Sequence, residues 1–121
     1  MNSAKVKAAL EEAMAIEGAL GVCLVDHQSG MTLGTAGGAG MNLEMAAAGT
    51  TEVVRSKLRV MGALGLEDRI EDMLITLGSQ YHLIRMVKET DSLFLYIALS
   101  KGPANLGMAK FQLFGVEQKL S

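Results

Sequence analysis

Few side chains of this sequence could take part in catalysis, and their spacing does not suit that role. Asp26, His27 and Ser29 are residue types of a nucleophilic triad, but all three fall in one turn. Residues so close together cannot aim at each other in the relay geometry that a triad requires. Glu71 and Asp72 are adjacent, so in a strand they face opposite ways and cannot form an acid/base pair. We therefore predict no catalytic residues and a protein that is not an enzyme.

Metal and cofactor sites are also poorly supported. His27, His82 and the single Cys23 do not stand at metal-ligand spacing. The glycine-rich stretch Gly34–Gly40 precedes a predicted helix, where backbone N–H groups could bind a phosphate. A P-loop would continue with Lys and then Ser or Thr, whereas Met41 follows here. We predict no metal and no cofactor, and we interpret the glycine stretch as a flexible loop.

Composition indicates a single domain, residues 1–121, with a balance typical of globular proteins. Half of the residues are apolar and a fifth are charged. The net charge of −2 and the scarcity of aromatic residues argue against nucleic acid as a partner. No apolar run approaches the roughly 18 residues that span a bilayer, so we expect no membrane insertion. The lone Cys23 fits a reducing, cytoplasmic location.

The first half of the chain predicts a helix, a hairpin and a long helix. Ser3 is a candidate N-cap for the first helix. Ala19–Asp26 and Met31–Ala36 are predicted strands joined by a glycine-containing turn. A helix over Leu43–Leu64 follows, with Asn42 as its N-cap. Its apolar residues cover an arc of about 160°, which is wide for a helix that packs on one surface, and small residues occupy the opposite side.

The second half predicts three strands and a closing helix. The strands are Asp68–Leu77, Gln80–Lys88 and Ser92–Ser100, and their short connections require antiparallel neighbours. Gly102-Pro103 is expected to open the last helix. The predicted fold is α+β: a five-stranded antiparallel sheet between helices, in the order α-β-β-α-β-β-β-α.

The strand Asp68–Leu77 presents a problem if it lies at the sheet edge, because a long apolar edge is open for pairing. A partner that continues the sheet would solve it. Lys57 falls within the apolar arc of the long helix, where its stem could follow the core or its amine could form an ion pair across an interface. The residues that we expect to mediate self-association are Glu52, Ser56, Arg59, Met73, Ile75 and Leu77.

In the order of its predicted elements the chain resembles the roadblock family, the domain related to dynein light chains that is also found in bacteria. The resemblance is carried by the segment 21–26 (Gly-Val-Cys-Leu-Val-Asp), the turn at Gly30, and the order of the long helix, three strands and closing helix. It covers nearly the whole chain. Profilin-like and ligand-sensing folds share parts of this three-layer sandwich, but the sensing folds usually have a pocket lined with aromatic residues.

The resemblance implies a homodimer in which the long helices pack together and Asp68–Leu77 pairs with its copy, giving a ten-stranded sheet. Many family members bind or regulate small Ras-like GTPases without supplying a catalytic residue. The implied function is therefore a homodimeric scaffold or adaptor for such a GTPase. The alternative is a profilin-like domain that senses a small molecule or nucleotide through Gly34–Gly40. The partner GTPase, the direction of regulation and a heterodimer with a paralogue all stay open.

Overall fold

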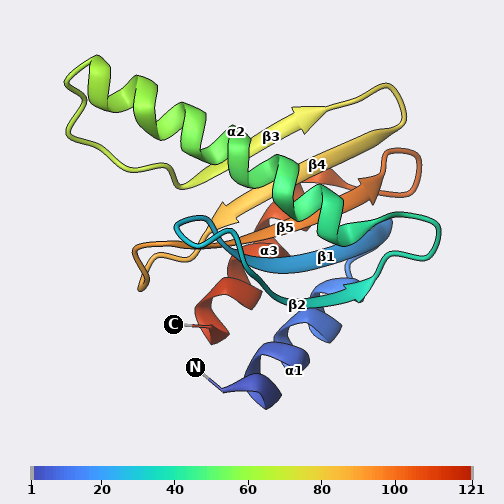
Figure 1. The fold of residues 1–121 in the computed structure, drawn as a ribbon. Helices are drawn as coiled ribbons and strands as arrows, with labels where there is room; N and C mark the ends of the chain where they lie inside the picture. Colours follow the sequence, from blue (N-terminus) through green and yellow to red (C-terminus); the bar gives the residue numbers. More distant parts are fainter. Residues whose placement is uncertain (1, 121) are drawn as a thin grey trace.

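The computed structural model describes residues 2–120, and its elements follow the predicted order. They are α1 (Ser3–Met14), β1 (Ala19–Asp26), β2 (Thr32–Gly37), α2 (Leu43–Ala63), β3 (Asp72–Thr76), β4 (Gln80–Met86), β5 (Leu93–Ser100) and α3 (Leu106–Lys119). α2 crosses one face of the sheet, and α1 and α3 lie on the opposite face (Figure 1). The α+β sandwich is thus confirmed. No helix within residues 2–120 is long and apolar enough to cross a membrane.

The five strands form one antiparallel sheet in the order β2-β1-β5-β4-β3. β5 is the central strand, and six consecutive residues of it are buried. A strand that is apolar on both sides must be covered on both faces, which explains why this segment shows no alternation of polar and apolar residues. β3 lies at one edge of the sheet, as expected, and β2 lies at the other.

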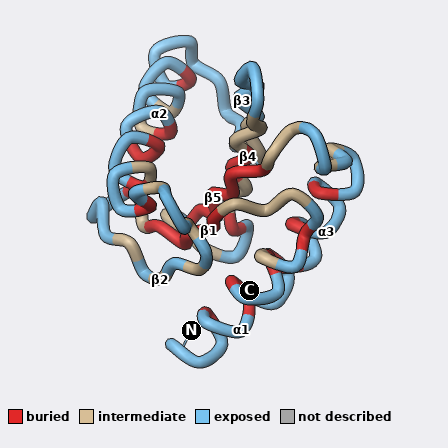
Figure 2. Tube along the Cα trace, turned by 90° about the vertical axis from the view of Figure 1, so that its right-hand side faces the viewer, coloured by how far each residue is buried: buried red, intermediate tan, exposed pale blue. Residues whose placement is uncertain are grey.

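Two apolar cores fill the space on the two sides of the sheet. Phe94 and Tyr96 belong to the core beneath α2, whereas Leu95 and Ile97 belong to the core beneath α1 and α3. Successive side chains of one strand point to opposite faces, so β5 alone supplies both cores. Figure 2 shows the buried positions concentrated along the centre of the sheet and on the inner sides of the helices.

Several predicted boundaries differ from the structure. The strand expected over Asp68–Leu77 covers only Asp72–Thr76, because β4 ends at Met86, whose N–H bonds the carbonyl of Glu71, and offers no further residues to pair with the segment before it. The helices α1 and α3 are capped by Asn2 and Asn105, not opened by Ser3 and Pro103. The Oδ1 atoms of Asn2 and Asn105 accept N–H donors three residues later at 2.8 and 3.0 Å, which satisfies helix donors that would otherwise be free.

Candidate self-association surface

The backbone of β3 leaves one row of hydrogen-bonding groups without a partner strand. At the two ends of its pairing with β4, Leu77 N–H donates to the carbonyl of Gln80 (2.8 Å) and Met86 N–H donates to the carbonyl of Glu71 (3.0 Å). In an antiparallel pair the bonded residues alternate, so the odd-numbered residues of β3 face β4. The residues whose N–H and C=O groups point toward the open edge are Asp72, Leu74 and Thr76.

The side chains of this edge are unusually apolar for a strand next to solvent. Leu74, Ile75 and Leu77 are 37%, 38% and 41% exposed. Ile75 is paired with His82 on the α2 side of the sheet, and Leu74 points to the side of α3. Edge strands in monomeric proteins are usually protected by charge, proline or a covering element. β3 has apolar side chains on both faces instead.

A groove runs between β3 and the facing flank of α2. It has a volume of about 520 Å³ and is lined by Glu52, Val53, Ser56, Lys57, Val60 and Met73. Val53 and Val60 are 42% and 46% exposed. A second hollow of about 510 Å³ extends it along the connection from α2 to β3. The apolar edge of the sheet and the apolar flank of α2 are therefore adjacent and form one surface.

Five of the six residues predicted for self-association lie on this surface. Glu52, Ser56 and Met73 line the groove, and Ile75 and Leu77 are exposed on and just after β3. Their role in self-association remains a prediction.

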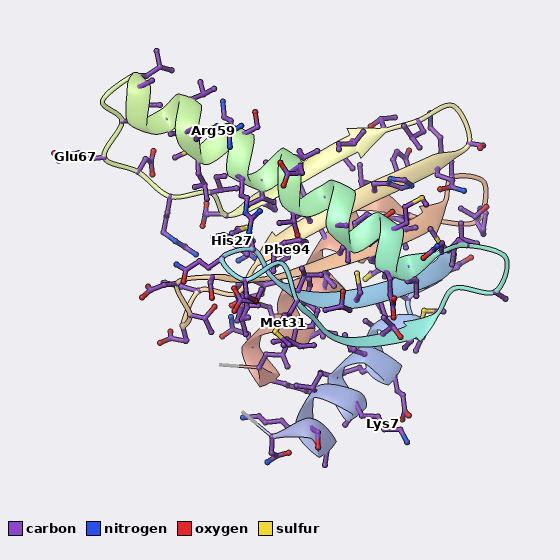
Figure 3. All side chains as sticks on the ribbon, in the orientation of Figure 1. Lys7, His27, Met31, Arg59, Glu67 and Phe94 are labelled. Carbon is purple, nitrogen blue, oxygen red and sulfur yellow. The ribbon has the colours of Figure 1, made fainter. Side chains whose placement is uncertain are left out.

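The sixth residue, Arg59, is exposed on α2 but is not among the residues that line the groove. It stands two helical turns after Glu52 and so lies on nearly the same side of the helix, at the margin of the groove. Its role in self-association also remains a prediction. Figure 3 labels Arg59 on α2.

Val53 and Val60 were not among the residues predicted for self-association. From periodicity alone they belong to the apolar arc of the long helix and are expected to face the sheet. That arc is wider than one buried face needs, and this extra width is the sequence signal that part of it is exposed.

Arg55 fixes α2 on the opposite side of the helix. Its Nε–H donates to the carbonyl of His27 (2.6 Å), its Nη2 to the carbonyl of Gln28 (3.0 Å), and its Nη1 lies 3.3 Å from Glu52 Oε1. These bonds hold α2 against the turn between β1 and β2 and so set how the helix lies across the sheet. Lys57, by contrast, lies on the groove wall with no ion pair among residues 2–120. The two interpretations of Lys57, a stem that follows the core and an ion pair across an interface, both stay untested.

The first part of the glycine-rich stretch is packed, and Gly34–Gly37 belongs to β2, which corrects its interpretation as a flexible loop throughout. Gly37 and Gly38 have φ values of +68° and +83°, which favour glycine. A Cβ on Gly38 would lie 2.6 Å from Leu43 Cδ1, and one on Gly37 would collide with the end of the Met14 side chain. Gly38 N–H donates to the carbonyl of Leu20 (2.8 Å). Gly37 and Gly38 are thus packed against α1 and α2, and the Gly38 donor is already engaged, whereas Gly40 has open space around it.

The polar side chains that suggested chemistry are engaged in local structure. Asp26 Oδ1 accepts the N–H groups of Gln28 (2.9 Å) and Ser29 (3.4 Å), which lowers the pKa of Asp26 and closes the turn. Cys23 is fully buried, and burial raises the pKa of its thiol to about 12, so the reactive thiolate is disfavoured. No group of three or more His, Cys, Asp or Glu residues within 2–120 could hold a metal ion.

His82 forms a partly buried polar chain on the α2 side. Its Nε2 lies 2.8 Å from Gln80 Oε1, and its Nδ1 lies 3.2 Å from the hydroxyl of Tyr96. A neutral imidazole protonated on Nε2 satisfies both contacts. Burial lowers the pKa of His82 and raises that of Tyr96 to about 12. Both groups therefore stay neutral near pH 7 and act as packing with satisfied hydrogen bonds.

Comparison with solved structures identifies the fold. No protein-family model and no curated protein matches the sequence. Myxococcus xanthus MglB matches with a TM-score of 0.86 at 17% identity, over 98% of this chain and 86% of that chain. The gliding protein MglB from Thermus thermophilus gives 0.81 at 17% identity, over 98% and 87%. A Roadblock/LC7 domain from Streptomyces avermitilis gives 0.74 at 9%, over 98% and 93%. The chain has the Roadblock/LC7 fold over nearly its whole length.

Proposed function

We propose that this chain is a non-enzymatic homodimeric scaffold that binds and regulates a small Ras-like GTPase. The observation that carries the proposal is the open edge of β3, with three exposed apolar side chains beside the groove against α2. A second copy would bond the free backbone groups and cover the apolar side chains at the same time. The resemblance to the roadblock family, together with its fold, supports both the dimer and the GTPase partner.

In the proposed dimer two β3 strands pair in antiparallel fashion about a two-fold axis perpendicular to the sheet. Such an axis keeps each face of the sheet on its own side, so the two α2 helices lie next to each other over one continuous ten-stranded sheet. The flanks that bear Val53 and Val60 then face the partner. A two-fold contact of this kind uses the same surface of both copies, and both the strand edge and the helix flank belong to one surface here.

Regulation in this proposal does not require a catalytic residue from this chain. Asp26, the acid of the candidate triad, accepts backbone N–H groups within its own turn, and no group of three or more His, Cys, Asp or Glu residues among residues 2–120 could hold a metal ion. A scaffold can still change a hydrolysis rate by fixing the position of groups that the GTPase itself supplies, because phosphoryl transfer depends mainly on positioning and electrostatics. The buried, reduced Cys23 is consistent with a cytoplasmic location, which belongs to the same proposal.

The test combines mass, binding and turnover. The single chain has a mass of 12.8 kDa, and a dimer has twice that mass. We expect light scattering after size exclusion to give at least the mass of a dimer. Adding a GTP-loaded small GTPase from the same cell should then give a complex of larger mass. Hydrolysis rates with and without the chain then report regulation. The mass of a single chain at every concentration would contradict the dimer, and no complex with any such GTPase would contradict the partner.

Nucleotide binding by the chain itself is the competing function. Because a ligand that binds only the folded state stabilises it, a thermal-shift series with GTP, GDP and ATP separates the two. The proposed scaffold predicts no shift with any of them. A rise of several degrees with one nucleotide would favour the sensor.

A further inference from the structure

The outer side of α3 is apolar, although it faces solvent. Phe111 and Met108 are 73% and 54% exposed. Two of the three charged residues of the helix, Lys110 and Glu117, instead form ion pairs with strands of the sheet. A surface helix normally has the reverse arrangement, with charged residues outside and apolar residues inside. The outer side of α3 is therefore suited to contact with another surface, where exposed aromatic residues are common.

This side of α3 borders a groove between α1 and α3. Two adjoining hollows make up the groove, one of about 560 Å³ near the end of α1 and one of about 400 Å³ near its start. Glu12 lines both hollows, so they are continuous. α1 and α3 lie on the side of the sheet opposite α2 (Figure 2), so this α1/α3 groove is separate from the surface formed by β3 and α2.

The two ends of the α1/α3 groove differ in chemistry. The end beside Phe111 has an apolar lining, which includes Ala15, Ile16, Gly115 and Val116. The other end is lined by Lys5, Lys119 and Glu12. The Lys119 ammonium lies 2.8 Å from the Glu12 carboxylate, whereas Lys5 forms no ion pair within residues 2–120. This end therefore carries one positive charge that is not compensated.

We propose that the α1/α3 groove binds an amphipathic helix of a partner protein, with apolar side chains against Phe111 and a carboxylate against Lys5. The groove is lined by two helices whose backbone groups bond internally, so it has no row of free backbone groups to pair with an extended peptide. A third helix packs in such a groove through its apolar side chains. The proposal does not rest on the proposed dimer, because the groove lies within one chain.

The charge of the groove also gives the direction of the partner helix. A carboxylate is most favourable near the N-terminus of its own helix, where it complements the helix dipole. The partner helix therefore begins near Lys5 and runs in the same direction as α1. The lining of the groove extends from Lys5 to Ile16, a length of about 17 Å, or three helical turns. The acidic residue of the partner thus belongs to the first turn, and its apolar residues follow over the next turns.

An anionic lipid surface is the competing occupant, and the charge of this face argues against it. α1 and α3 together carry four lysines and three glutamates. Segments that bind anionic lipids usually have clusters of about four to eight basic residues. The single uncompensated charge of Lys5 fits one carboxylate of a protein partner instead.

Binding of synthetic helical peptides, measured by isothermal titration calorimetry, tests the proposal. Each probe is an acetylated, alanine-based peptide of about four helical turns with leucine, phenylalanine or methionine along one face. The position of that face in the first turn carries glutamate in one series and lysine in the other. We expect the glutamate series to bind the wild type more tightly than the lysine series by about three-fold or more.

Two variants of exposed residues locate the bound peptide. Phe111→Gln removes the ring without adding charge and should weaken binding of the glutamate series by about ten-fold. Lys5→Glu should reverse the preference, so that the lysine series binds more tightly, and a merely structural role of Lys5 would not cause this reversal. Met31→Gln, at a 62% exposed apolar residue beside β2, is the matched control. Met31→Gln and Ile75→Lys should both bind the glutamate series as the wild type does, because β2 and β3 lie outside the groove.

Four results would overturn the proposal. The first is that no peptide of either series binds at concentrations up to about 1 mM. The second is binding that neither Phe111→Gln nor Lys5→Glu affects, because the peptide then binds elsewhere. The third is flotation of the wild type, but not of Phe111→Gln, with vesicles of phosphatidylcholine and phosphatidylserine, because a lipid surface then covers this face. The fourth is a loss of oligomer mass in Phe111→Gln, because a second copy then covers it. Pairing through β3 is tested separately by Ile75→Lys.

Discussion

Replacing Ile75 with lysine puts a charge on the open edge of the sheet without altering the interior of the single chain. Ile75 lies on β3, opposite His82 of β4, and 38% of its surface is exposed. The new ammonium can reach water in a monomer, because the edge has no further strand beside it. In the proposed dimer the same position is covered by the second copy. The substitution therefore acts on association and not on folding.

The size of the effect follows from the exposed area. Burying a whole isoleucine side chain contributes about 1.5 to 3 kcal/mol, so covering the 38% that is exposed contributes roughly 0.6 to 1.1 kcal/mol per copy. A dimer contains two copies, and the loss of about 1.1 to 2.3 kcal/mol raises the dimer dissociation constant about 6- to 50-fold. Desolvation of two like charges near the axis increases it further.

Sedimentation equilibrium over a dilution series measures this dissociation constant, with thermal melting followed by circular dichroism as the check on folding. Met31→Lys makes the same chemical change at the opposite edge of the sheet and should leave the constant unchanged. If Ile75→Lys melts normally and its dissociation constant stays within two-fold of the wild type, β3 is not part of the interface and the reasoning fails.

Three further predictions concern the stability of the single chain. Burial lowers the pKa of both His27 and His82 below 6.5, so the unfolded chain binds more protons than the folded chain. The free energy of unfolding should therefore fall as pH drops below about 6.5, by at most about 1.4 kcal/mol per pH unit for each histidine. Thermal melts from pH 7.5 to 5.5 measure this fall, and a stability that does not change with pH would contradict it. Glu117→Gln removes the buried carboxylate from the Arg85 guanidinium, which keeps only the partly exposed Asp72 at 3.6 Å, and should cost about 3 kcal/mol in urea unfolding, the lower end for a broken buried pair. A loss below about 1 kcal/mol would contradict a structural role for this pair. Arg55→Met removes two hydrogen bonds to carbonyl groups and should lower the free energy of unfolding by about 1 to 3 kcal/mol. Arg59→Met, one turn later on the exposed surface of α2, is the control and should cost under about 0.5 kcal/mol. Equal losses in urea titrations would refute the contact between Arg55 and the turn after β1.

The order of the elements could be predicted because it depends on local signals. Glycines bound the first strand, and its predicted limits, Ala19–Asp26, are those of β1. The unbroken apolar run of β5 required a central position, whereas the edge position of the strand that begins at Asp72 was implied by the resemblance to the roadblock family. These inferences use only periodicity, turn residues and the need to cover apolar surface.

The features that could not be predicted depend on how distant segments meet. Arg55 bonds the carbonyls of His27 and Gln28, which are 28 and 27 residues away in sequence, and no local pattern indicates that contact. The direction in which α2 crosses the sheet decides whether Val53 is buried or exposed, and a helical wheel cannot supply that direction. The capping roles of Asn2 and Asn105 escape prediction for a different reason. Ser3 is as good an N-cap as Asn2, and Gly102-Pro103 is also an acceptable start for the last helix.

Amide hydrogen exchange at Leu74, followed by NMR over a dilution series, tests the central claim most directly. The N–H of Leu74 points to the open edge of β3, whereas that of Ile75 points to β4. Strand pairing between copies predicts that Leu74 exchanges slowly in the oligomer and rapidly when the chain is diluted or carries Ile75→Lys, while the amides that face β4 stay protected throughout. Rapid exchange at Leu74 in a sample whose mass is at least that of a dimer would show that the copies associate without pairing their β3 strands, and it would contradict the account.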